Sequence, residues 1–98
     1  MNESKNKVSR NIIIKSRTGL HARPAAIFVQ VANKFDSEIS VTKADQKVNG
    51  KSIMGILMLA AAQGQEIIIT AEGPDAEIAI IELEKILITD DGDLKNEV

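Results

Sequence analysis

The 98-residue chain contains no cysteine, tryptophan or tyrosine, and only one histidine. Without cysteine no disulfide can form, and a metal site would lack its usual ligands. Basic and acidic residues are nearly balanced, 12 against 14, and the two phenylalanines offer no surface on which bases could stack. We therefore predict a protein without a metal site, a cofactor or a nucleic-acid partner.

Long hydrophobic runs are also missing. No apolar stretch near residue 1 is typical of a secretory signal, and no segment has the length needed to span a membrane. We therefore expect a cytoplasmic protein without a membrane partner. Apolar residues nevertheless make up 44% of the chain, which is enough for one globular domain with an aliphatic core.

Hydrophobic periodicity predicts seven elements in the order β-α-β-β-α-β-α. Strands are expected over 8–15, 38–43, 47–49 and 65–72, and helices over 22–33 and 53–62, with a last helix opened by Pro74. This order predicts an α+β fold in which helices cover one face of an antiparallel sheet. The domain should span 8–88, between a flexible end (1–7) and an acidic tail (89–98). The strand residues expected to face the core are Ile12, Ile14, Ile39, Val41, Ile67, Ile69 and Ala71.

The single histidine lies in residues 19–25, Gly-Leu-His-Ala-Arg-Pro-Ala, where a strand gives way to a helix. His21 is an N-cap candidate, close to the unpaired N–H groups of the first turn, which form a ready site for a phosphate. The positive helix end favours the neutral imidazole, whose lone pair can attack phosphorus. Arg23 brings a guanidinium suited to phosphate oxygens, and Pro24 is tolerated in a first turn. Taken alone, such a histidine is more often a simple cap or a surface residue.

Residues 19–25 resemble the phosphohistidine motif of HPr, the histidine-containing phosphocarrier of the bacterial sugar phosphotransferase system. Residues 49–55, Asn-Gly-Lys-Ser-Ile-Met-Gly, resemble the regulatory serine motif of the same family. The two motifs stand in the family's order and at its spacing, and the similarity runs from about Val8 to Leu87. The resemblance implies an open-faced β-sandwich, in agreement with the periodicity.

The resemblance further implies that His21 takes a phosphoryl group on Nδ1 from phosphorylated enzyme I and passes it to enzyme IIA domains. Arg23 would steady the phosphate, Pro24 would fix the start of the helix, and the N–H groups of Ala22 and Arg23 would contact the oxygens. Thr18 could assist through its hydroxyl, or be an ordinary turn residue. The chain would then be a carrier modified by enzymes, not itself an enzyme.

Ser52 matches the regulatory serine, which HPr kinase/phosphorylase would phosphorylate. It is also a good N-cap for the helix that follows, and the two roles are compatible. Four apolar residues match the family's docking surface around the phosphohistidine: Leu20, Ile53, Met54 and Leu57. The alternative for Met54 and Leu57 is a place in the core.

Two other functions remain open at this point. The first is an HPr-like carrier in a regulatory phosphorelay, such as the nitrogen-related branch, with the same histidine and other partners. The second is a small interaction module without phosphate chemistry, which periodicity cannot distinguish from a carrier. In each case we expect a monomer.

Overall fold

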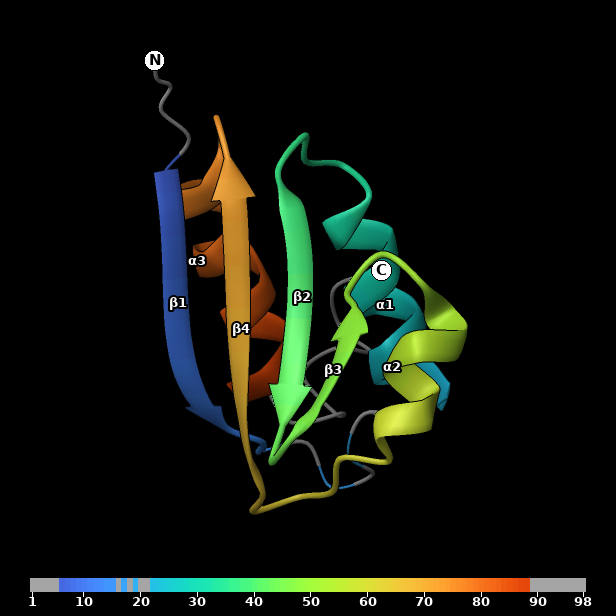
Figure 1. The fold of residues 1–98 in the computed structure, drawn as a ribbon. Helices are drawn as coiled ribbons and strands as arrows, with labels where there is room; N and C mark the ends of the chain where they lie inside the picture. The colour runs from blue at the N-terminus through green and yellow to red at the C-terminus, as the bar shows by residue number, and fades with distance from the viewer. Residues whose placement is uncertain (1–5, 16, 18, 20–21, 89–98) are drawn as a thin grey trace.

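The fold is given by a computed structural model that describes residues 6–15, 17, 19 and 22–88. Its seven elements follow the predicted order (Figure 1). The bounds of one strand, 38–43, match the prediction, whereas other elements differ by a few residues at their ends. The elements are β1 (Asn6–Ile13), α1 (Ala22–Ala32), β2 (Glu38–Lys43), β3 (Gln46–Asn49), α2 (Ile53–Leu59), β4 (Glu66–Gly73) and α3 (Ala76–Ile88).

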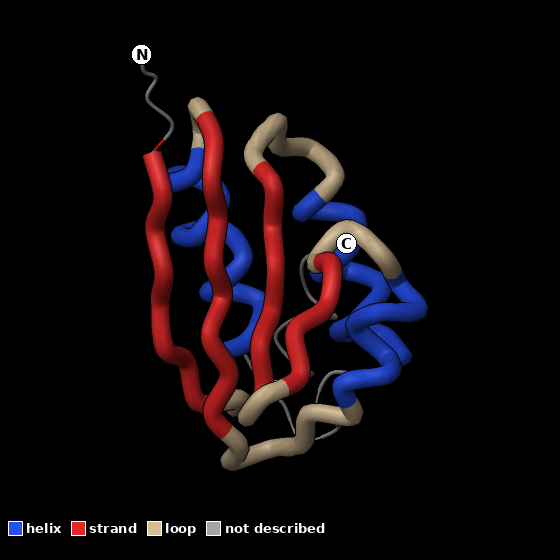
Figure 2. Tube along the Cα trace, in the orientation of Figure 1, coloured by secondary structure: helices blue, strands red, loops and turns tan. Residues whose placement is uncertain are grey.

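The four strands form one antiparallel sheet in the order β1-β4-β2-β3. The last strand in the chain, β4, therefore lies between β1 and β2. All three helices lie against one face of this sheet, and the other face is open (Figures 1 and 2). The predicted fold class, an α+β open-faced sandwich, is confirmed.

The covered face of the sheet carries the hydrophobic core. Along β4, buried residues alternate strictly with partly exposed ones, so a shift of one residue in register would expose the whole set. From the helices, α1 contributes Phe28, the largest of the fully buried side chains, and α3 contributes a stripe at helical spacing. All of the residues predicted to face inward are buried: Ile12, Ile14, Ile39, Val41, Ile67, Ile69 and Ala71.

The first strand begins earlier than predicted. It starts at Asn6 rather than Val8, because β4 continues to Gly73 and provides partners for Asn6 and Lys7. These two residues thus belong to the sheet and not to the flexible end predicted for 1–7. Residues 1–5 of that end and the whole tail 89–98 lie outside the described residues.

The last helix begins later than predicted, at Ala76, and Pro74 lies in the turn before it. The carboxylate of Asp75 accepts hydrogen bonds from the backbone N–H groups of Asp36 and Ser37, both at 2.9 Å, and from the Ser37 hydroxyl. The Ser37 hydroxyl bond, followed by the Asp36 N–H bond, lowers the pKa of Asp75. One carboxylate therefore ties the α1–β2 connection to the turn that precedes α3.

The Asp75 bonds predict a pH-dependent stability. Because the folded-state pKa of Asp75 lies below the ordinary pKa of an aspartate, the ionised carboxylate stabilises the fold at pH values above that ordinary pKa. This stabilisation is lost as the pH falls from about the ordinary pKa of an aspartate through the lowered folded-state pKa. We expect Asp75→Asn to reduce the free energy of unfolding at pH 7, measured by urea titration, and the difference from wild type to shrink at acid pH. An equal difference at both pH values would contradict this account.

Candidate functional site

The histidine motif is described on both sides of the histidine but not at it. Gly19 and the residues from Ala22 onward are described, whereas three predicted site residues, Thr18, Leu20 and His21, lie outside the described residues. Gly19 is buried and has a positive φ of 71°. The site can therefore be built from the segment that leads to the histidine and from the helix that follows it.

Helix α1 begins at Ala22, directly after His21 in the sequence, as predicted. Its first turn contains no acidic side chain, so none of its own carboxylates occupies the positive helix end. The backbone N–H groups of Ala22 and Arg23 belong to the group that has no acceptor within the helix. Arg23 is exposed and Pro24 is fully buried. This first turn offers two N–H donors and a nearby guanidinium to an anion in front of the helix.

Ser52 caps the second helix, as predicted. Its backbone is extended, and its Oγ accepts a hydrogen bond from the Gly55 N–H at 3.1 Å. The Ser52 carbonyl accepts the next bond, from the Ile56 N–H at 3.0 Å. The hydroxyl is thus partly shielded and points toward the positive end of α2, where added negative charge is favourable.

The loop before Ser52 is fastened to the far end of α1. The Lys51 ammonium donates to the Phe35 carbonyl at 2.7 Å, and Asn33 Nδ2 donates to the Lys51 carbonyl at 3.2 Å. Helix α2 therefore starts beside the end of α1 and runs back toward the start of α1 (Figure 1). At 1.5 Å per residue its seven residues span about 10 Å. Ser52 and the start of α1 lie at opposite ends of this antiparallel helix pair.

Three of the four predicted docking residues are described, and all three are exposed. Ile53, Met54 and Leu57 project from α2, whereas Ile56 and Leu59 of the same helix are buried. The structure adds Met58, which is 65% exposed and was not predicted. Its spacing of four residues from Met54 could have revealed it. We call Ile53, Met54, Leu57 and Met58 the α2 patch.

The predicted end of the second helix is wrong. Helix α2 ends at Leu59 instead of 62, and Gly64 does not stop it. The C-cap is Ala60, in the left-handed region at φ 50° and ψ 39°, and its N–H donates to the Leu57 carbonyl. The left-handed conformation is strained for an alanine, so the helix end is determined by tertiary contacts and not by local preference.

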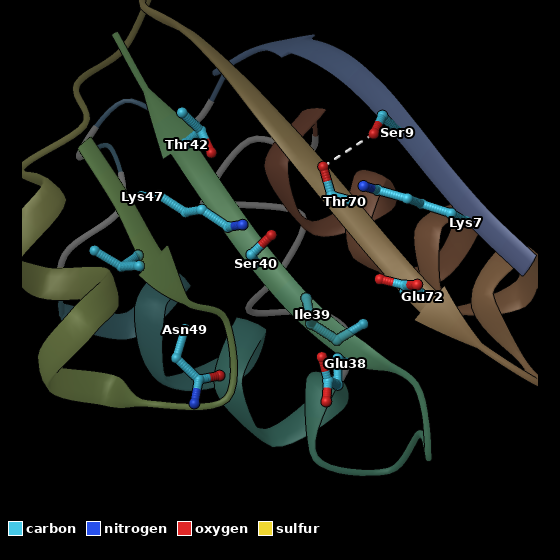
Figure 3. Close-up of a pocket in the computed structure, with 11 residues that line it drawn as sticks. Lys7, Ser9, Glu38, Ile39, Ser40, Thr42, Lys47, Asn49, Thr70 and Glu72 are labelled. Atoms are coloured by element: carbon cyan, nitrogen blue, oxygen red, sulfur yellow. Dashed lines mark hydrogen bonds between the residues drawn. The ribbon is translucent and has the colours of Figure 1, made fainter. Parts of the chain in front are cut away.

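A hollow of about 660 Å³ lies on the open face of the sheet (Figure 3). The ammonium groups of Lys7 and Lys47 point into it from the two outer strands, toward the hydroxyls of Thr70 and Ser40. Thr70 also shares a hydrogen bond of 3.0 Å with Ser9. None of the predicted site residues that are described lines this hollow, which faces away from the helices. It is not part of the candidate site.

The described residues contain neither a grouping of metal-ligand side chains nor a helix that could span a membrane. Within residues 6–15, 17, 19 and 22–88, no three histidine, cysteine or acidic side chains are grouped so that they could hold a metal ion. In the same part of the chain, no helix combines the length and the apolar character required to cross a bilayer.

A family model for the PTS HPr component phosphorylation site matches residues 8–89 of this chain. The chain belongs to the HPr family. It is thus an HPr-like phosphocarrier, and the match includes both segments that flank the histidine as well as the whole of α2. Carriers of this family are not catalysts in their own right, which agrees with the prediction from the sequence.

Sequence relatives and solved structures agree with the family. The chain is 49% identical to the HPr-like protein Crh of Halalkalibacterium halodurans over 74% of this chain and 87% of the relative. It is 42% identical to the phosphocarrier protein HPr of Treponema pallidum, over 81% and 90%. The crystal structure of HPr from Bacillus anthracis superposes with a TM-score of 0.81 at 46% identity, covering 83% and 96%.

One solved relative differs in its assembly. Crh of Bacillus subtilis is described as an intertwined dimer with a swapped domain, and it matches with a TM-score of 0.67 at 46% identity, over 72% of this chain and 82% of that one.

Proposed function

We propose that this chain carries a phosphoryl group on His21, taking it from phosphorylated enzyme I and passing it to enzyme IIA domains of the phosphotransferase system in the cytoplasm. The observation that carries the proposal is the first turn of α1, which directly follows His21 and contains Arg23 but no acidic residue. The family match over both flanking segments supports the same assignment.

The proposed step uses the lone pair of a neutral imidazole. Nδ1 of His21 attacks phosphorus while the bond from phosphorus to the donor's leaving group breaks, and the proton of the ring stays on Nε2. The N–H groups of Ala22 and Arg23 and the Arg23 guanidinium would hold the phosphoryl oxygens. Because positioning and charge stabilisation do most of the work in phosphoryl transfer, the carrier needs no further catalytic groups.

Transfer from phosphoenolpyruvate through enzyme I tests the proposal. We expect intact-mass measurement to show one added phosphate on the wild type, labile to acid, and none on His21→Ala. An enzyme I shown to be active on its own HPr is the control. Failure of the wild type to accept phosphate from that enzyme would contradict the carrier role.

We propose that the α2 patch docks the partner proteins. Its four members are all exposed and recur at helical spacing on a helix that has no charged residue, and two of them are methionines, whose flexible side chains suit several partners. The patch lies on the helix whose far end approaches Gly19, so a partner seated on it would also face the start of α1.

A charge within the patch should weaken docking without unfolding the domain. Met54 and Ile78 are similarly exposed, at 64% and 59%, but Ile78 lies on α3. We expect Met54→Glu to raise the KM of enzyme I for this chain by about tenfold, or about 1.4 kcal/mol. The matched variant Ile78→Glu should leave KM unchanged. Equal effects of the two substitutions would remove the α2 patch as the docking surface.

We also propose that Ser52 is phosphorylated by HPr kinase/phosphorylase. Its place at the N-cap is electrostatically favourable for the dianion of a phosphoserine. The same dianion would stand next to Ile53 and Met54, so it would place charge beside the apolar α2 patch. After incubation with the kinase and ATP, we expect mass spectrometry to place the phosphate on Ser52 and Ser52→Ala to remain unmodified. Modification of another residue, or of none, would leave Ser52 with its capping role alone.

A regulatory role is the second candidate function, because relatives of this chain include the HPr-like protein Crh. The two functions differ in the fate of the phosphate on His21. A sugar-transport carrier passes it to enzyme IIA domains, whereas a carrier in a regulatory branch passes it to other partners. Transfer from the phosphorylated chain to an enzyme IIA domain therefore distinguishes them.

The oligomeric state is a separate proposal. We propose a monomer, because all eight residues of β1 pair with β4 of the same chain. Since Crh of Bacillus subtilis is an intertwined dimer, family membership alone does not decide the question. Sedimentation at several protein concentrations would decide it.

A further inference from the structure

The backbone just before the histidine touches the backbone just after α2. A Cβ added to Gly19 would lie 2.4 Å from the Ala61 carbonyl oxygen and 2.9 Å from the Ala62 Cα. Both atoms belong to the main chain, so no side chain could move aside to make room. With its φ of 71°, Gly19 also has a conformation that other residues rarely adopt. The position requires glycine for two independent reasons.

The segment under Gly19 is itself firmly held. We call residues 60–62 the α2 exit. The Lys43 ammonium donates to the Ala60 carbonyl at 3.3 Å. Gln65 binds Ala62 twice, since its Oε1 accepts from the Ala62 N–H at 2.8 Å and its own N–H donates to the Ala62 carbonyl at 3.0 Å. Gly19 therefore lies against a backbone segment that these three hydrogen bonds hold in place.

The chain that leads to Gly19 is also held further upstream, at Ile14 and Lys15. The Ile14 N–H donates to the Gln65 carbonyl at 3.0 Å, and the Gln63 side chain donates to the Lys15 carbonyl at 3.2 Å. On the other side of the histidine, α1 begins at Ala22. Leu20 and His21 thus stand in the sequence between two points of backbone whose positions are set by packing.

From this arrangement we infer that Gly19 is a positioning residue for phosphoryl transfer: its contact with the α2 exit sets the place from which the chain leads to His21. Gly19 touches neither phosphate nor partner in this role. The inference rests on the proposed function of His21 and assigns to the α2 exit a part in it that is distinct from docking. Helix α2 and the segment after it would then contribute to the reaction in two ways. The α2 patch would dock the partner, and the α2 exit would position Gly19.

The expected size of the effect follows from the geometry. A Cβ at position 19 would have to move by about 1 Å to reach an ordinary contact distance from the Ala61 oxygen. A displacement of that size in a reacting group can reduce a rate by on the order of 100-fold. Docking should be preserved, because the α2 patch does not change.

Gly64 provides a matched control. It also has a positive φ, 87°, but a Cβ added there meets nothing within 4 Å. Gly19→Ala and Gly64→Ala therefore share the backbone strain, and only the first disturbs the α2 exit. With enzyme I and phosphoenolpyruvate, we expect Gly19→Ala to lower kcat by about tenfold or more and to leave KM within about twofold of wild type. Gly64→Ala should match the wild type in both.

A second readout does not depend on transfer. The chain has a single histidine, so its imidazole C–H signals in a proton NMR spectrum need no assignment. We expect Gly19→Ala to shift these signals and the midpoint of their pH titration, and Gly64→Ala to leave both unchanged. If the wild type accepts no phosphate, the proposed function fails, and this NMR comparison still tests the positioning role.

Three results would overturn the inference: equal kinetics and spectra of the two variants, an increase in KM without a fall in kcat, or wild-type imidazole signals in Gly19→Ala. If Gly19→Ala does not fold at the assay temperature, Gln65→Ala takes its place. It removes only the side-chain bond to Ala62 at an exposed position, and a kcat reduced by about twofold to threefold is expected. A wild-type kcat in that variant would also overturn the inference.

Discussion

The structure depends on one constraint, the alternation of side chains in a sheet with a single covered face. The buried aliphatic residues of the strands lie on one side of the sheet, with Ile13 and Ile68 turned to the other, and all three helices pack on the side that carries the buried set. With Phe28 as the only fully buried aromatic side chain of the described core, this packing is made almost wholly from isoleucine, leucine, valine and alanine. The ends and outer surfaces of the helices lie outside this core and are therefore available for binding and chemistry.

Helix α2 concentrates several features in seven residues. It has a serine cap at one end and a left-handed alanine at the other, and it is apolar both inward and outward. Its start is fastened to the end of α1 through Lys51 and Asn33, and its exit lies under Gly19. Helix α2 and its two ends therefore join three features in one short stretch of chain. These are the candidate modification site, the candidate docking surface and the support for the histidine segment.

The sequence was sufficient for the order of elements, the inward-facing strand residues, the Ser52 cap and the exposure of Ile53, Met54 and Leu57. These follow from local periodicity or, for the exposed residues, from the resemblance to the HPr family. Features that depend on distant contacts could not be predicted. Ala60 ends α2 in a conformation that alanine disfavours, and nothing local indicates it. Likewise, the Asp75 carboxylate binds Asp36 and Ser37 from far along the chain, and no local pattern indicates these bonds.

We have proposed that the first turn of α1 holds the phosphoryl group on His21. Amide NMR spectra of the chain before and after phosphorylation by enzyme I are the decisive test. We expect the N–H signals of Ala22 and Arg23 to shift strongly when phosphate is present, because these groups become donors to its oxygens. Signals from the open face of the sheet, such as Ser40 and Thr70, should stay in place. A phosphorylated His21 with unshifted Ala22 and Arg23 signals would contradict the claim.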